Sequence, residues 1–80
     1  MNIFELKPIN GRKSFYHKCR VEVDGNISYL YSYNTNVAYY NKEKGEIVVK
    51  GQYSGTTTSH VKAFLNFYGF EANHKLYMNG

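Results

Sequence analysis

The lone cysteine and the three histidines are the side chains best suited to act as nucleophiles, bases or metal ligands: Cys19, His17, His60 and His74. His17 and Cys19 share one face of an extended strand, but roughly 6.5–7 Å separates them along that strand. A thiolate–imidazole pair needs a direct hydrogen bond, so this spacing favours a buried structural cysteine. Because the histidines are scattered and no second cysteine completes a ligand set, we expect no metal site.

Acid–base chemistry also lacks a recognisable pattern. Asp24 is the only aspartate and falls in a turn sequence, and the glutamates form no obvious pair. No glycine-rich phosphate loop is present. His60 flanks the buried stripe of a predicted helix, where we expect it to hydrogen-bond to the neighbouring Ser/Thr cluster or to a sheet edge. We therefore expect no catalytic residues, no cofactor and no enzyme activity.

The polar segment 54–59 has two interpretations. As a helix N-terminus with exposed N–H groups, it could receive a phosphate. As a capping and sheet-docking segment it needs no ligand, and we favour this interpretation because Ser54 suits the N-cap position.

Tyrosine is the residue type with the clearest potential for recognition. Tyr29, Tyr31 and Tyr33 fall on every second position, so an extended strand would place them in one aromatic row. Beside Arg and Lys, such rings stack on the bases of single-stranded nucleic acid or form hot spots of a protein interface. Alternatively, the row is buried by the C-terminal tail, the N-terminal arm or a second copy of the chain. Tyr39 and Tyr40 follow closely.

The composition limits the class of protein. Eighty residues with 18% aromatics and one cysteine indicate a single domain, residues 1–80, without an intramolecular disulfide. Lacking a long apolar run or a signal-like start, it is expected to be soluble and cytoplasmic, with no membrane association. The net charge of +4 favours anionic partners such as nucleic acid, although ordinary solubilising charge also explains it. Part of the excess lies at Arg12, Lys13, Lys18 and Arg20.

The first half of the chain predicts strands. Residues 1–13 indicate a short strand or docked arm, and alternation over 14–24 indicates a second strand. Asp24-Gly25 predicts a two-residue hairpin turn. The resulting register opposes Cys19 to Leu30 and Val21 to Ser28 on one face. On the other face it opposes Tyr16 to Tyr33, Lys18 to Tyr31, Arg20 to Tyr29, and Glu22 to Ile27.

The second half predicts two more strands and a helix. The strands cover 37–40 and 46–50, and a polar break at 34–36 separates the first of them from the strand that follows the Asp24-Gly25 turn. Apolar residues at helical spacing predict a helix over roughly 55–68. Gly69 fits the position after its C-terminus, with Phe70 folding back onto Leu65. The tail, 71–80, could add a short edge strand.

Together these elements predict an α+β domain, with an antiparallel meander sheet of four or five strands and one helix packed on one face. The more apolar sheet face belongs beneath the helix: Phe15, Cys19, Val21 and Leu30. The opposite face then turns the tyrosine row outward beside the basic side chains.

Two segments resemble the signatures of a family of short, uncharacterised proteins from phages and mobile elements of Gram-positive bacteria. Residues 30–38, LYSYNTNVA, are similar to an S-Y-x-T-x-V-A signature. Residues 53–65, YSGTTTSHVKAFL, are similar to a second signature, aromatic-S-x-T-T-x-x-H-[IV]-x-x-F-L. The resemblance implies a phage or prophage origin and carries no established activity or ligand. Small accessory phage proteins often bind host machinery, including CRISPR nucleases.

We therefore expect a phage-type accessory protein, working in the bacterial host cytoplasm, that inhibits a host defence protein or ribonucleoprotein such as a CRISPR effector. The alternative is a nucleic-acid-binding protein that uses the same face. Because anti-CRISPR proteins that mimic DNA are frequently acidic, a charge of +4 argues against simple mimicry. The expected partner-binding residues are Tyr16, Lys18, Arg20, Tyr29, Tyr31 and Tyr33.

Overall fold

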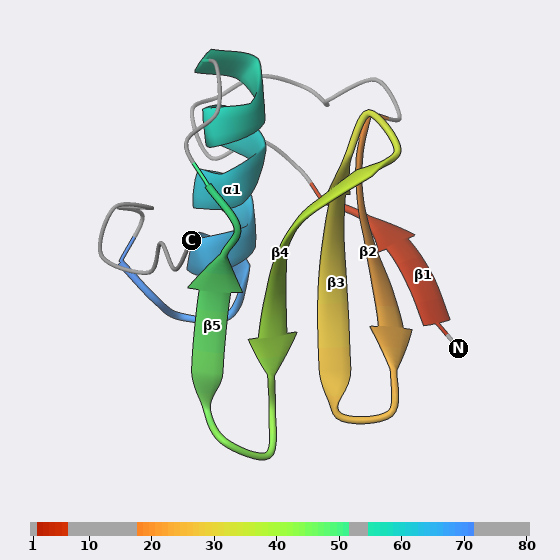
Figure 1. Ribbon diagram of the computed structural model, residues 1–80, viewed down its shortest axis with the longest axis vertical. Coiled ribbons are helices and arrows are strands. Elements are labelled where there is room, and N and C mark those ends of the chain that lie inside the picture. Colours follow the sequence, from red (N-terminus) through yellow and green to blue (C-terminus); the bar gives the residue numbers. More distant parts are fainter. Residues whose placement is uncertain (1, 7–17, 52–54, 72–80) are drawn as a thin grey trace.

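The computed structural model describes residues 2–6, 18–51 and 55–71, which form a sheet and a helix (Figure 1). The elements are β1 (Asn2–Glu5), β2 (Cys19–Asp24), β3 (Ile27–Ser32), β4 (Thr35–Asn41), β5 (Glu46–Val49) and α1 (Gly55–Phe67). The five strands lie in the order in which they occur along the chain, and every neighbouring pair is antiparallel. The predicted α+β meander with one helix on one face is therefore confirmed.

The hairpin between β2 and β3 forms where the sequence predicted it, but its register differs by two residues. Asp24 pairs with Ile27, so Gly25 and Asn26 occupy the centre of the turn. Gly25 has φ +62° and takes the first central position, which is the requirement of a type II′ turn. The predicted pairings of Arg20 with Tyr29 and of Cys19 with Leu30 are therefore wrong. A shift of two keeps each side chain on its predicted face, because side chains alternate with period two.

The turn between β3 and β4 begins earlier than predicted. Tyr33 and Asn34 both have positive φ, 53° and 69°, and Ser32 pairs with Thr35 on either side of them. This is the backbone of a type I′ hairpin turn. Tyr33 therefore leaves the strand, and the prediction that it continues the row of Tyr29 and Tyr31 is wrong.

A bulge in β4 changes which residues face the helix. Leu30 pairs with Ala38 and Tyr31 pairs with Asn36, so Val37 is the extra residue. The Asn36 side-chain amide donates to the backbone oxygens of Leu30 at 3.0 Å and Ala38 at 2.9 Å, and this bridges the irregularity. Val37 and Ala38 are both buried in the core as a result.

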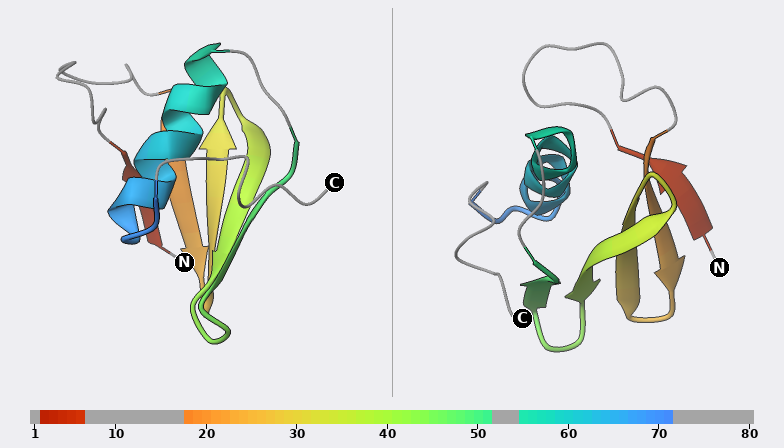
Figure 2. Two further views of the ribbon diagram at one scale, coloured as in Figure 1. Left: turned by 90° about the vertical axis from the view of Figure 1, so that its left-hand side faces the viewer. Right: turned by 45° about the horizontal axis from the view of Figure 1, so that its top comes forward.

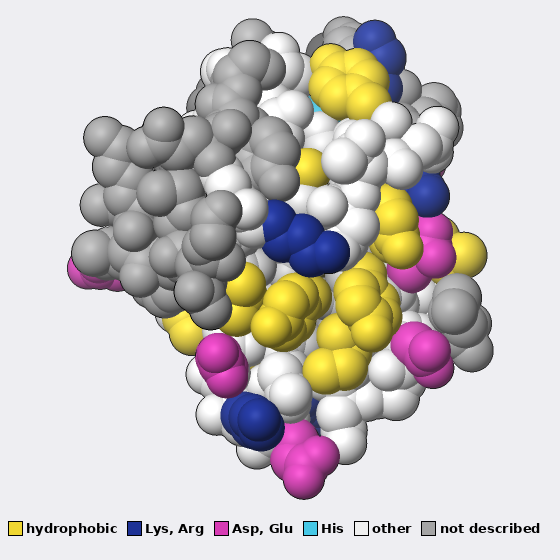
Figure 3. All heavy atoms as spheres, in the orientation of Figure 1, with side chains coloured by type: hydrophobic (Ala, Val, Ile, Leu, Met, Phe, Trp, Pro, Cys, Tyr) yellow, Lys and Arg dark blue, Asp and Glu magenta, His cyan; other side chains and the backbone are white. Residues whose placement is uncertain are grey.

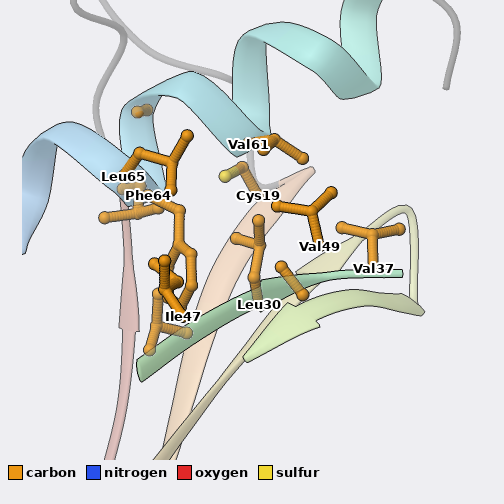
Figure 4. Packing of buried hydrophobic residues seen from close by; sticks show 12 residues of the cluster. Cys19, Leu30, Val37, Ile47, Val49, Val61, Phe64 and Leu65 are labelled. Carbon is orange, nitrogen blue, oxygen red and sulfur yellow. The ribbon is translucent and has the colours of Figure 1, made fainter. Parts of the chain in front are cut away.

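One face of the sheet is covered by α1, as the views in Figure 2 show. The helix contributes a stripe of fully buried side chains, Val61, Phe64 and Leu65, at the spacing predicted from the sequence. These point toward the sheet in Figure 4. They meet strand residues that include those predicted for this face: Cys19, Val21, Leu30, Val37, Ala38, Ile47 and Val49. None of the helices in the described ranges is long and apolar enough to cross a membrane.

The C-terminus of α1 ends in the predicted cap. Gly69 has φ +81°, its N–H donates to the oxygen of Asn66 at 3.1 Å, and the Phe70 N–H donates to the oxygen of Leu65 at 2.9 Å. This pair of bonds is a Schellman motif. Phe70 then packs its ring against Tyr40, with centroids 5.7 Å apart. The predicted N-cap, Ser54, lies outside the described residues, as do Phe15 and the predicted strand segments 14–17 and 72–80.

Glycine substitutions at the two ends of α1 should have opposite effects on stability. Gly69→Ala places a Cβ on a residue with φ +81° and should lower the free energy of unfolding by about 1 kcal/mol. Gly55→Ala at the first helical residue meets open space at ordinary φ, and should raise it by up to about 1 kcal/mol. Urea unfolding followed by circular dichroism measures both, and equal effects of the two variants would contradict the cap.

Candidate binding face

The sheet face opposite α1 carries three tyrosines, and we call this surface the tyrosine face: Tyr29, Tyr31 and Tyr39. Tyr29 pairs directly with Tyr39 across β3 and β4, and Tyr31 lies two residues along β3. All three are half-buried. Figure 3 looks onto this side of the molecule, where hydrophobic and tyrosine side chains gather over the middle of the sheet. Directly opposite side chains in such pairs pack against each other.

Arg20 holds Tyr31 in place. Its guanidinium carbon lies 4.5 Å from the centroid of the Tyr31 ring, directly across from it in the β2–β3 pair. The Nε donates to Glu22 Oε2 at 2.8 Å and Nη1 donates to Asn34 Oδ1 at 2.7 Å. Two hydrogen-bond acceptors thus orient the guanidinium, and the cation–π contact orients the Tyr31 ring. Two predicted site residues on this face, Arg20 and Tyr31, therefore form one rigid unit.

The tyrosine face is acidic at its margins. Among residues on the described strands, four acidic side chains alternate onto it, and Arg20 is the basic one: Glu5, Glu22, Asp24 and Glu46. Lys50 directly follows β5 and adds a second positive charge, which still leaves an excess of acid. The described residues contain six basic and six acidic side chains, so the chain's net charge of +4 comes from residues outside the described ranges. The remaining basic residues, Lys7, Arg12, Lys13 and Lys75, lie outside the described ranges.

The other predicted site residues do not join this face. Tyr33 lies in the β3–β4 turn, 50% exposed, with its ring centroid 5.7 Å from that of His60. The Lys18 ammonium lies 5.5 Å from the centroid of the same ring. Lys18 and Tyr33 thus form a second group at the end of the sheet. Tyr16 lies outside the described residues.

Sequence reasoning missed Tyr39 as a member of the face. Its orientation depends on the bulge at Val37, which places Tyr39 outward and Tyr40 toward the helix. Tyr40 stacks on Tyr68 with centroids 4.4 Å apart, so it belongs to the packing on the helix side. The signal in the sequence was the consecutive apolar pair Val37-Ala38, which indicates a bulge. A bulge at this point would have predicted the outward position of Tyr39.

A serine–histidine pair lies beneath the β3–β4 turn. Ser32 Oγ is hydrogen-bonded to His60 Nδ1 at 2.7 Å and to Thr57 Oγ1 at 3.1 Å. Ser32 and His60 are 2% and 1% exposed, so no substrate reaches the hydroxyl. The pair ties the first turns of α1 to the end of β3, so His60 is hydrogen-bonded as predicted, but its partner is on the central strand rather than in the neighbouring Ser/Thr cluster or at a sheet edge. It also brings together the two segments that carry the family resemblance.

Burial shifts the titration of the two described side chains that the sequence offered for chemistry. Desolvation lowers the pKa of His60, so the ring is neutral at pH 7. Desolvation, with a smaller contribution from the negative charge of Glu5, raises the pKa of Cys19 to about 12. Cys19 is therefore a buried thiol rather than a nucleophile. His17 and His74 lie outside the described residues, and the described residues contain no cluster suited to a metal ion.

A hollow of about 310 Å³ lies between the β2–β3 turn and the end of α1. Tyr40, Tyr68 and Val23 line it, and the exposed Lys42 stands at its rim. The Tyr68 hydroxyl donates to Ser28 Oγ at 2.8 Å inside it. Within the described ranges, every buried polar side-chain atom has a hydrogen-bond partner. No buried polar side chain that lines the hollow therefore lacks a hydrogen-bond partner, and we take the tyrosine face as the better candidate site.

The pKa of His60 predicts how stability changes with pH. Because the folded-state pKa lies below the ordinary value of 6.5, the unfolded chain takes up the proton first. The free energy of unfolding should therefore fall as the pH drops below about 6.5, and the loss should end once the folded-state pKa is passed. Urea unfolding between pH 7.5 and 5 measures this. His60→Gln should be less stable at pH 7.5 but show a shallower decline, and identical declines would contradict the assignment to His60.

Comparison with curated proteins and with solved structures gives no match. Residues 4–80 match a family of unknown function, DUF8033. The match begins within β1 and includes all the strands and the helix that build the tyrosine face and its support. Because it covers nearly the whole chain, the protein belongs to the DUF8033 family.

Proposed function

We propose that this protein acts by binding another protein through the tyrosine face, and that it inhibits a host defence protein or ribonucleoprotein such as a CRISPR effector. The observation that carries the binding proposal is the arrangement of Tyr29, Tyr31 and Tyr39 on the sheet face that α1 does not cover. An aromatic centre with a charged margin has the layout of a protein interface.

The tyrosines are suited to this role because they are held in place before a partner arrives. Arg20 fixes the ring of Tyr31, and Tyr29 and Tyr39 are paired across neighbouring strands. Preorganised side chains lose little conformational entropy on binding, so more of the contact energy appears as affinity. Tyrosine and arginine are also the residue types enriched among binding hot spots.

The charges around the face favour a basic protein surface over nucleic acid. Glu5, Glu22, Asp24 and Glu46 surround the tyrosines, whereas Arg20 already contacts Glu22 and Asn34. A phosphate backbone would be repelled by this margin, since single-strand readers need a cationic groove. A partner bearing Lys or Arg gains complementary charges at the same positions.

The resemblance to phage and mobile-element proteins supports the choice of host defence proteins as the partners to test first. A CRISPR effector combines basic protein grooves with RNA, so its protein surface fits the acidic margin. In this proposal the inhibitor works in the cytoplasm of the bacterial host, where it occupies a surface that the effector needs.

Replacing two tyrosines should abolish partner capture without unfolding the domain. We expect Tyr29→Thr with Tyr31→Thr to keep the circular dichroism spectrum, because threonine suits strands and neither tyrosine belongs to the core cluster. Capture of a CRISPR effector or another host protein by the tagged chain should fall at least tenfold. Lys62→Ala, an exposed helix position away from the face, serves as the control and should bind normally. Unfolding of the double variant would place the tyrosines in the core and contradict the proposal.

Titration with a fluorescent single-stranded oligonucleotide tests the alternative function directly. At low salt, where electrostatic binding is strongest, we expect no saturable change in anisotropy at micromolar protein. Micromolar binding that weakens steeply with added salt and is lost in the double tyrosine variant would instead establish nucleic-acid recognition by this face.

A further inference from the structure

One tyrosine and one carboxylate of the tyrosine face already hold an arginine between them. The Arg20 guanidinium carbon lies 4.5 Å from the centroid of the Tyr31 ring, while its Nε donates to Glu22 Oε2 at 2.8 Å. Arg20 lies directly opposite Tyr31, and Glu22 follows two residues along β2. The carboxylate is therefore diagonal to the ring, a separation of about 7–8 Å at Cα that long side chains bridge. The chain's own arginine thus shows how this surface binds a guanidinium.

Two further tyrosines on the same face also have a carboxylate in a diagonal position. Asp24 is diagonal to Tyr29 across β2 and β3, and Glu46 is diagonal to Tyr39 across β4 and β5. In each case the acidic residue lies two positions along the neighbouring strand from the residue directly opposite the ring. The register therefore repeats the combination of ring and carboxylate that surrounds Arg20.

These two combinations differ from the first because no described cation lies between their members. Within the described ranges, the cation–π contacts are on two other tyrosines, Tyr31 and Tyr33. Asp24 and Glu46 are exposed, and neither forms an ion pair with a described residue. Figure 3 shows acidic side chains beside the hydrophobic and tyrosine side chains on this face. A cation supplied by a partner can therefore reach both rings and both carboxylates.

We infer that the tyrosine face binds two arginine side chains of its partner, one between Tyr29 and Asp24 and the other between Tyr39 and Glu46. Each guanidinium stacks on the ring and donates to the carboxylate, as Arg20 does with its own two contacts. The inference rests on the proposed function, because it names the groups that the same face recognises.

The geometry favours arginine over lysine. A guanidinium is planar, so one face can lie on an aromatic ring while the N–H groups at its edge reach a carboxylate. A lysine ammonium is a compact and more strongly hydrated point charge, which makes the two contacts harder to combine. Arg20 demonstrates that both contacts form together on this sheet.

The spacing of the two rings defines the segment that presents the arginines. Tyr29 and Tyr39 lie directly opposite each other on β3 and β4, so their Cα atoms are about 4.5–5.5 Å apart. Residues one turn apart on a helix have a similar spacing of about 5–6 Å, and alternate residues of a strand are slightly further apart. Arginines clustered in this way are typical of nucleic-acid-binding surfaces. The partner surface that fits is therefore an arginine-rich groove of a ribonucleoprotein.

Calorimetric titration of the full chain with two capped peptides tests the inference. The probes are Gly-Arg-Gly-Arg-Gly and Gly-Lys-Gly-Lys-Gly, which carry the same charge. The arginine peptide should bind about fivefold or more tightly than the lysine peptide. General attraction does not account for such binding, because the chain itself carries a net charge of +4. Equal affinities, or no binding of the arginine peptide at millimolar concentration, would overturn the inference.

Charge-neutralising variants test the two carboxylates. Asp24→Asn keeps a residue that suits the first position of a turn, and Glu46→Gln keeps the side-chain shape, so both should stay folded. Each should weaken binding of the arginine peptide about threefold or more. Glu71→Gln, an exposed position after α1, removes the same charge elsewhere and should bind as the wild type does. Unchanged binding in the variant with both substitutions would overturn the inference.

The peptide titration separates this inference from the proposed function. If the arginine peptide does not bind but host-protein capture is still lost in Tyr29→Thr with Tyr31→Thr, the arginine sites are wrong and the binding face stands. If the arginine peptide binds as described but host-protein capture does not depend on the tyrosines, the arginine sites stand and the proposed function is wrong.

Discussion

The extra residue at Val37 is the constraint on which the two faces of this sheet depend. Side chains alternate along a strand, so one inserted residue reverses the orientation of everything beyond it relative to an unbulged partner. In β4 the insertion lets Val37 and Ala38 both enter the core, while Asn36 bridges the irregularity with two hydrogen bonds to backbone oxygens. Tyr39 consequently faces outward and Tyr40 faces the helix. The same residue type thus lies on the proposed binding face on one side and packs against the helix on the other.

The rigidity of the tyrosine face has a second origin in the β3–β4 turn. The positive φ angles of Tyr33 and Asn34 carry the chain back in two residues, which brings the Asn34 side chain within 2.7 Å of Arg20. Arg20 can then hold Tyr31 by its ring and Glu22 by its carboxylate. Beneath the turn, the Ser32 hydroxyl is hydrogen-bonded both to Thr57 Oγ1 and to the neutral ring of His60, which joins the sheet to the start of α1. The hydroxyl–imidazole pair is buried, so its chemistry serves stability.

The net charge of the whole chain and the charges on the described strands of the tyrosine face favour different kinds of partner. The chain carries +4, a value that favours anionic ligands, yet its described residues balance and the tyrosine face has an acidic margin. Net charge sums over the whole surface, whereas a partner meets one face at distances within a Debye length of about 8–10 Å. In the proposed interface, a partner would therefore meet the local distribution of charge, which depends on strand register.

The sequence by itself determined the strands, the helix with its Gly69 cap, the face beneath the helix and the structural character of Cys19 and His60. Each of these follows from local spacing: alternation with period two, a helical stripe, a glycine at positive φ, and the lack of ligand partners. Only the tertiary structure decided the hairpin register. It also decided that Tyr33 lies in the β3–β4 turn rather than in the tyrosine row, and that Tyr39 lies on the tyrosine face. A bulged and an unbulged β4 have nearly equal local free energies, and so do hairpins with different pairs of turn residues. Packing against α1 and the bonds of Asn36 and Arg20, which link residues distant in sequence, select among them.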